Sequence, residues 1–174
     1  YEIDRSLRDL LTLYMDAPLL AHLTPHLANL GELAGGRLNT LADLADKHPP
    51  QLHHRDKFGR DAEWIEVHPA YDEIRRIAFE QFGMHAMTSR AGVLGWPEAM
   101  PTLAKQAFFY LFSQAEFGVL CPTNLTDCTS DLLERYGSPE LKARYLDRMR
   151  TQDMNELLYG AQFMTEKIGG SDAG

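Results

Sequence analysis

The sequence contains few cysteines and no long apolar run. Cys121 and Cys128 are its two cysteines, too few for a disulfide framework and without the Cys/His clustering of a structural zinc site. We therefore expect two reduced, buried thiols in a cytoplasmic protein. No stretch approaches the ~20 consecutive apolar residues that a membrane-spanning helix requires, so no membrane partner is predicted.

Basic residues are also scarce. The 17 Lys and Arg residues are outnumbered by 25 Asp and Glu residues, which gives a formal net charge of -8. This balance disfavours a broad electrostatic grip on phosphate backbones or anionic lipid, so nucleic acid is not expected to bind through this segment. With 44% hydrophobic residues over 174 positions, the chain has enough apolar material for one core.

Helical periodicity organises the first part of the chain. Across Pro18–Leu30, leucines recur at steps of three and four residues, which places them on one face of an amphipathic helix. After Gly35–Gly36, a three-residue leucine spacing predicts a shorter helix that ends before His48–Pro50. Residues 51–68 combine the turn-forming Asp56–Gly59 with residues that favour extended backbone, so we expect a loop or a small hairpin there.

Further helices are predicted downstream. Pro69 suits the first position of a helix that should run to Gly83. A long helix is expected over Pro101–Leu120, apolar on most sides and broken by Pro122. Two more helices should follow, over residues 125–136 and 138–150, separated by Gly137. The pattern therefore predicts an antiparallel-type helical bundle.

The helical signal stops before the last residues. Leu157–Met164 is an apolar run suited to a buried strand, and it leads into the glycine-rich Thr165–Gly174. Glycines let a planar or phosphorylated ligand approach, while the hydroxyls of Thr165 and Ser171 can hydrogen-bond it. On residue types alone, a solvated turn is the favoured interpretation. Tyr1 and the loop-like end lead us to expect that both termini are internal to a longer protein.

Two motifs in the second half resemble a known family. Met164-Thr165-Glu166 followed by Gly170-Ser171-Asp172 resembles the Thr-Glu-Pro-x-x-Gly-Ser-Asp signature of acyl-CoA dehydrogenases. Upstream, Tyr136–Leu146 is similar to the family's glycine, acidic, lysine, tyrosine-leucine segment. Lys167 replaces the proline of the signature, and with His48–Pro50 it resembles the AidB-like branch, which is associated with the alkylation response.

This resemblance implies a fold and a function. Residues 1–156 would form the all-α N-terminal helical domain of the acyl-CoA dehydrogenase fold, and residues 157–174 the truncated start of a β-domain. The parent would be a homo-oligomer that uses FAD to dehydrogenate an acyl-CoA at its α,β bond. The alternatives are an AidB-like flavoprotein acting mainly in DNA protection, with DNA binding in a missing carboxyl-terminal portion, and a purely structural helical interaction domain.

The resemblance also assigns residues. Met164 and Thr165 would meet the flavin through backbone and hydroxyl, Gly170 would permit the approach, and Ser171 would contact a phosphate-bearing part of the cofactor or substrate. The family's catalytic glutamate lies in its carboxyl-terminal helices, so no catalytic residue is expected in this chain, and Glu166 is not given that role.

Other candidates have plainer interpretations. His22 and His26 have the spacing of two metal ligands, but no acidic partner follows, so surface positions are favoured and no metal is predicted. An aromatic group could line an acyl channel, although core packing is favoured; it comprises Phe108, Phe109, Tyr110, Phe112 and Phe117. Cys121–Thr126 is a weak candidate for a ligand site, and a structural role is favoured for it. Five arginines are expected to be ordinary surface charge, namely Arg75, Arg76, Arg144, Arg148 and Arg150.

Overall fold

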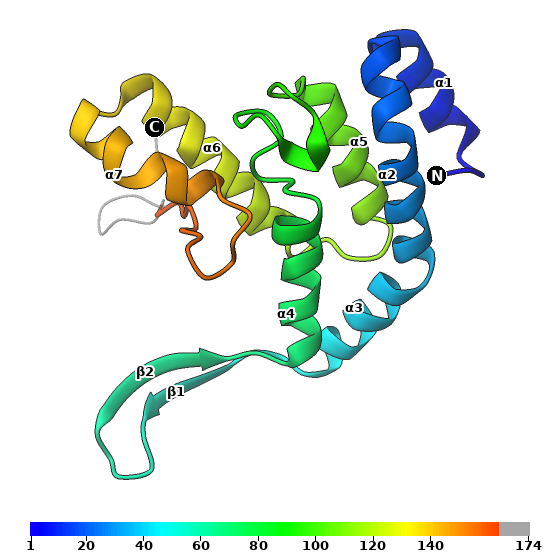
Figure 1. Cartoon of the computed structure of the whole chain (residues 1–174). Helices are drawn as coiled ribbons and strands as arrows, with labels where there is room; N and C mark the ends of the chain where they lie inside the picture. Colours follow the sequence, from blue (N-terminus) through cyan, green and yellow to red (C-terminus); the bar gives the residue numbers. More distant parts are fainter. Residues whose placement is uncertain (164–174) are drawn as a thin grey trace, which may run out of the picture.

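The computed structural model describes residues 1–163, which form helices and one two-stranded hairpin (Figure 1). In order, the elements are α1 (Arg5–Tyr14), α2 (Ala17–Gly35), α3 (Arg37–Lys47), β1 (Gln51–Arg55), β2 (Asp61–Glu66), α4 (Pro69–Arg76), the π-helical turn η1 (Ile77–Gln81), the 3-10 turn η2 (Val93–Gly95), α5 (Thr102–Phe112), α6 (Leu120–Tyr136) and α7 (Pro139–Arg150). Within this described part, no helix is long and apolar enough to cross a membrane.

The core forms where α2 packs against α3 and α5. The leucine stripe predicted on α2 faces inward and is buried at Leu19, Leu23, Leu27 and Leu30. Large aromatic side chains from later in the chain complete the core, namely Phe79, Phe82, Phe108 and Phe112. Burying each such side chain contributes about 1.5–3 kcal/mol, so this apolar interior is the main source of stability.

Helix α1 was not predicted from the sequence. Asp4 caps it, because the Leu7 amide donates to Asp4 Oδ1 over 2.9 Å, which satisfies one of the free N–H groups at a helix start. Leu7 and Leu11 are buried, so this short helix covers one side of the core.

The single long helix predicted between Pro101 and Leu120 is wrong, because α5 ends at Phe112 and α6 begins at Leu120. Glu116 stabilises the connection, since its carboxylate accepts from the amides of Gly118 at 2.6 Å and Val119 at 2.9 Å. Pro122 does not break a helix but lies in the first turn of α6. Its missing N–H costs nothing there, because the first amides of a helix have no intrahelical partner.

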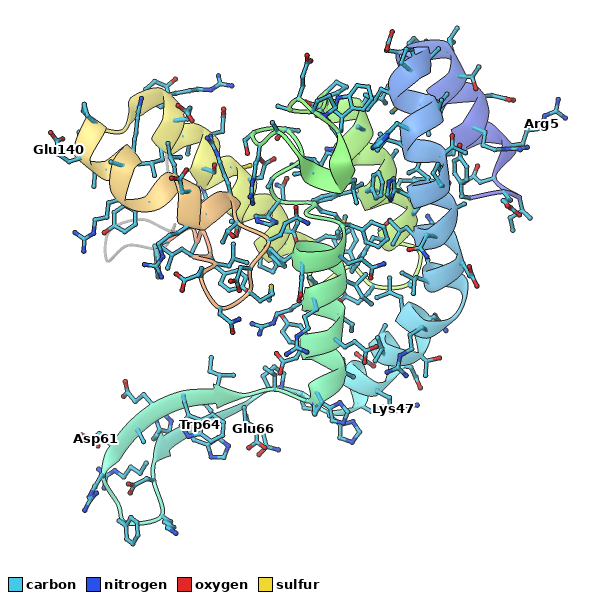
Figure 2. All side chains as sticks on the ribbon, in the orientation of Figure 1. Arg5, Lys47, Asp61, Trp64, Glu66 and Glu140 are labelled. Carbon is cyan, nitrogen blue, oxygen red and sulfur yellow. The ribbon has the colours of Figure 1, made fainter. Side chains whose placement is uncertain are left out.

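The predicted hairpin over residues 51–68 is confirmed as β1 and β2. The two strands are antiparallel, with Leu52 opposite Ile65 and His53 opposite Trp64. Figures 1 and 2 show the hairpin projecting away from the helical body, with Asp61, Trp64 and Glu66 along its length.

The helices expected at residues 69–83 and 138–150 are confirmed. Pro69 occupies the first turn of α4, which continues directly into the π-helical turn η1. Gly83 ends the segment with a φ of +58°, a left-handed conformation that glycine adopts without strain. Ser138 caps α7 by accepting from the Leu141 amide at 3.3 Å.

The strand predicted over residues 157–164 does not form at the described positions 157–163. A strand needs a hydrogen-bonded neighbour, and this segment packs on helix α6 instead. The remaining residues, 164–174, lie outside the part of the chain that the structure describes.

Candidate functional site

The residues predicted to bind the cofactor are Met164, Thr165, Gly170 and Ser171, and all four lie outside the described residues. Their assignment therefore stays a prediction. The structure describes the residues that precede this segment and, separately, a groove between α5 and α6.

The approach is fixed at Gly160. Its amide donates to Thr126 Oγ1 over 3.1 Å, and the Thr126 hydroxyl donates to the Pro122 carbonyl over 2.7 Å. A Cβ atom at Gly160 would clash with Thr129 and lie 2.6 Å from the Leu125 carbonyl oxygen, so a larger residue would push the chain off α6. Thr126 thus acts structurally, in keeping with the interpretation favoured from the sequence for the Cys121–Thr126 region.

Tyr159 lies beside this anchor point. Its ring packs edge-on against Phe79 with centroids 5.1 Å apart, and the Arg75 guanidinium lies 5.8 Å from the ring centroid. Partial burial raises the pKa of the Tyr159 hydroxyl. Arg75 is therefore part of an internal packing cluster, which corrects its expected role as plain surface charge.

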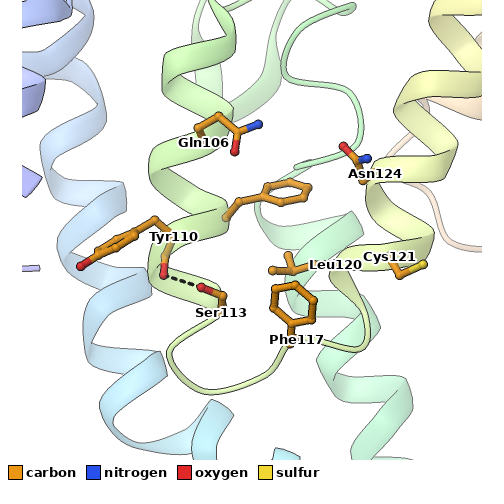
Figure 3. A pocket seen from close by; sticks show the side chains of 8 residues that line it. Gln106, Tyr110, Ser113, Phe117, Leu120, Cys121 and Asn124 are labelled. Atoms are coloured by element: carbon orange, nitrogen blue, oxygen red, sulfur yellow. Dashed lines mark hydrogen bonds between the residues drawn. The ribbon is translucent and has the colours of Figure 1, made fainter.

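An apolar groove runs between α5 and α6 (Figure 3), and we call it the α5–α6 groove. Its volume is about 540 Å³, and it is lined by Gln106, Phe109, Tyr110, Ser113, Phe117, Leu120, Cys121 and Asn124. Phe108 and Phe112 point into the core, as predicted. Phe109 and Phe117 line the groove instead, and Phe117 is 74% exposed. Tyr110 borders the groove, but its ring points away from it (Figure 3).

A buried ion pair lies behind the groove. Lys105 Nζ, from α5, is 2.5 Å from Asp127 Oδ2 on α6 and donates to Asn124 Oδ1 over 3.0 Å. The other carboxylate oxygen of Asp127 accepts from the Thr88 hydroxyl at 3.0 Å. Sequence reasoning missed this network, although a lone cation inside the apolar run of α5 was a usable signal.

His85 is another residue that the sequence did not single out. It is fully buried, it donates from Nε2 to the Thr151 carbonyl over 2.9 Å, and burial lowers its pKa to about 4. His22 and His26 are half-buried rather than on the open surface. His22 Nε2 lies 2.9 Å from the Leu94 carbonyl and its ring packs against Trp96.

Two other sequence expectations need correction. Cys121 and Cys128 are exposed, not buried, because the inner face of α6 is taken by Thr123, Thr126, Asp127 and Ser130. Arg150, expected on the surface, is largely covered and contacts Glu134 at 2.7 Å and Ser130 at 2.8 Å.

Comparison with known proteins places these features in a wider context. Residues 1–156 match the family model described as the adaptive response protein AidB N-terminal domain. The chain is 29% identical over 175 residues to acyl-CoA dehydrogenase family member 11 of Caenorhabditis elegans, covering 98% of this chain and 27% of that protein. It is 31% identical over 159 residues to the putative acyl-CoA dehydrogenase AidB of Escherichia coli strain K12, covering 84% of this chain and 28% of that protein.

Solved structures agree. The chain superposes on the apo form of Bd2924 with a TM-score of 0.83 and 28% identity, covering 98% of this chain and 33% of that one. It superposes on Caenorhabditis elegans ACDH-11 in complex with C11-CoA with a TM-score of 0.82 and 25% identity, covering 99% and 29%. These matches confirm the predicted helical fold class and the AidB-like resemblance. The chain spans less than a third of the length of the curated relatives.

Proposed function

Because this chain belongs to the family of AidB N-terminal domains, we propose that it is the N-terminal part of a flavin-dependent acyl-CoA dehydrogenase-like protein. In the proposed full-length protein, bound FAD would supply the acceptor for a hydride from the β-carbon of an acyl-CoA. The catalytic base would come from outside this chain, and residues of this chain would bind and orient the acyl-CoA and the flavin.

The observation that carries the proposal is the α5–α6 groove, an apolar space of about 540 Å³. An acyl chain needs an apolar channel that excludes water from its methylene groups. The side chains of Phe109, Phe117 and Leu120 provide apolar surface against which methylene groups can pack. A related protein from Caenorhabditis elegans was solved in complex with C11-CoA, which supports the same ligand class here.

Helix α6 links this groove to the predicted flavin segment. The same helix that lines the groove with Leu120, Cys121 and Asn124 holds Gly160 through Thr126. The last described residues before Met164 are therefore held on α6 at Gly160. In the proposed full-length protein, hydride transfer requires the flavin to lie close to the bound acyl chain.

The cofactor assignment predicts the effect of two substitutions in the full-length protein. Thr165→Val and Ser171→Ala each remove one hydroxyl that is expected to hydrogen-bond the flavin or its phosphates. Each loss should weaken flavin affinity by ~1 kcal/mol, or about fivefold, measured by equilibrium dialysis. Matched controls are Thr12→Val and Ser6→Ala in α1, which should leave flavin affinity unchanged. If Thr165→Val and Ser171→Ala both leave flavin affinity unaltered, the assignment of Thr165 and Ser171 to the cofactor site is wrong.

A second function is favoured by the family match itself, which is to an adaptive response protein. The full-length protein would then be a flavoprotein acting in DNA protection, with DNA binding supplied beyond this acidic segment. Salt-sensitive DNA binding without acyl-CoA turnover would favour this second function over dehydrogenation. The family resemblance further supports a cytoplasmic homo-oligomer. Light scattering of the purified full-length protein would measure its oligomeric state.

A further inference from the structure

The two walls of the α5–α6 groove belong to helices that pack mainly elsewhere. Helix α5 packs chiefly against α2, and α6 packs chiefly against α7. Close packing of α5 on α6 therefore does not set the distance between the groove walls. The Glu116-closed connection sets this distance at one end of the groove, and side chains that cross from one helix to the other set it further along.

Lys105 makes this crossing. From α5 its ammonium reaches two residues of α6, Asp127 at 2.5 Å and Asn124 at 3.0 Å. The side chains of Lys105 and Asp127 are only 6% and 11% exposed, so water screens their attraction weakly. Thr88 holds the far side of the carboxylate by donating to it over 3.0 Å. The pair is therefore fixed at both ends.

The same ammonium contacts one lining residue from each wall. Asn124 lines the groove on α6, and Phe109 lines it on α5. Lys105 Nζ lies 5.0 Å from the centroid of the Phe109 ring, within the range of a cation–π contact. An ammonium has donors only, so Asn124 has to turn its Oδ1 toward Lys105, which fixes the orientation of its amide. One buried charge thus positions both walls.

We propose that the Lys105–Asp127 pair, with Asn124, is a brace that sets the width of the α5–α6 groove and thereby selects acyl chains by shape. This inference rests on the proposed function, because it takes the acyl chain as the occupant of the groove. Lys105 is a positioning residue: it determines specificity by holding Phe109 and Asn124, and it does not line the groove itself. With its width held by the brace, the groove is expected to bind an unbranched chain more tightly than a chain with a methyl branch.

The test compares two ligands in the full-length protein. The double variant Lys105→Met/Asp127→Asn removes the pair while keeping side-chain volume, and it avoids a buried carboxylate without its counter-charge. Affinities for an unbranched acyl-CoA and for its methyl-branched isomer are measured by isothermal titration calorimetry. One misplaced methyl group changes binding by ~10-fold or more in a fixed pocket. We expect that preference in the wild type and a preference below about threefold in the variant.

The control removes an ion pair from the same helix but away from the groove. Arg135 and Asp131 are exposed and 2.8 Å apart on α6, so Arg135→Met/Asp131→Asn changes the same kinds of atoms without touching Phe109 or Asn124. This control should keep the wild-type preference. A preference that is unchanged in the brace variant, or equally lost in the control, overturns the brace.

A second readout separates the brace from the choice of ligand. Nitroxide labels on Cys121 and on a Gln106→Cys substitution, in a background without other reactive cysteines, report the distance across the groove. We expect a broader distance distribution when the brace is removed, and an unchanged distribution overturns the brace with or without acyl-CoA binding. If the wild-type protein binds neither acyl-CoA but the brace variant still shows the broader distribution, the proposed function is overturned and the brace remains as a structural device without its assigned ligand.

Discussion

At the scale of single residues, His85 shows how burial turns an ordinary side chain into a sensor of pH. Its ring packs against Phe79 with centroids 4.9 Å apart, and Nε2 donates to the carbonyl of Thr151. Desolvation lowers its pKa to about 4, opposed by the Thr151 hydrogen bond and the nearby Asp127 and reinforced by Arg90. The folded chain therefore holds a neutral imidazole, and protonating it opposes folding.

This buried imidazole predicts acid sensitivity. Between pH 6.5 and 4 the unfolded chain binds a proton at this position that the folded chain does not, so stability falls as the pH falls. His85 should account for a loss of about 2 kcal/mol between pH 7 and pH 5. Urea unfolding at both pH values measures it, and His85→Gln should show a smaller loss. An identical pH dependence in the variant would contradict this account.

Gly160 gives a second prediction at this scale. Gly160→Ala should push residues 157–163 off α6, because the added Cβ would clash with Thr129 and the Leu125 carbonyl. In the full-length protein we expect flavin affinity to fall at least fivefold, a loss of ~1 kcal/mol, by equilibrium dialysis. Gly35→Ala is the matched control, since a Cβ there meets nothing within 4 Å. If Gly160→Ala and Gly35→Ala bind flavin with equal affinity, the contact at Gly160 does not contribute to flavin binding.

At the scale of elements, the β1–β2 hairpin stands apart from the core. It pairs only within itself among the described strands, and its apolar residues Leu52, Trp64 and Ile65 are exposed. A two-stranded hairpin without further packing is only marginally stable in water. Its cross-strand side-chain contacts include the His53 ring stacked on Trp64, with centroids 4.3 Å apart, and the His53–Glu66 contact at 2.7 Å.

The hairpin should therefore open independently of the helices. We expect its amides to exchange with deuterium at least about 100-fold faster than those of α2, because local opening needs less free energy than global unfolding. His53→Ala should speed exchange at Leu52 and Ile65 further and leave α2 unchanged. His54→Ala is the control, since His54 is exposed on the same strand. Protection in β1 and β2 equal to that in α2 would show that the hairpin is part of the core unit.

Local pattern and tertiary context contributed differently to these elements. The start of α7 at Ser138–Pro139 and the stripe of α2 follow from short-range rules that any chain obeys. The turn between α5 and α6 could not be found in this way, because Glu116 closes it by reaching amides two and three residues ahead. The adjoining apolar residues look the same in a helix and in a buried turn.

At the scale of the whole molecule, the groove and the anchored segment lie on one helix, but they enclose no complete cofactor site within residues 1–163. The chain spans 33% and 29% of the two solved relatives. A dinucleotide cofactor is normally buried over most of its surface, so further protein surface is needed to enclose it.

The isolated 174-residue chain should therefore retain little or no flavin. The reason is that one edge of a pocket recovers too little contact to offset the entropy lost on binding. Absorbance of the purified chain after incubation with FAD and gel filtration tests this expectation. Stoichiometric flavin on the isolated chain would contradict it and would mean that residues 1–174 form a complete site.

The sequence by itself determined the helical class, the leucine face of α2, the hairpin and the family, because periodicity, turn residues and a short signature are local properties of the chain. Tertiary structure alone decided that Lys105 crosses to Asp127, that His85 is buried and that Gly160 rests on Thr126. Each of these contacts joins residues between 22 and 66 positions apart. Their energies depend on burial and on distance in space, and neither is written in the local order of residues.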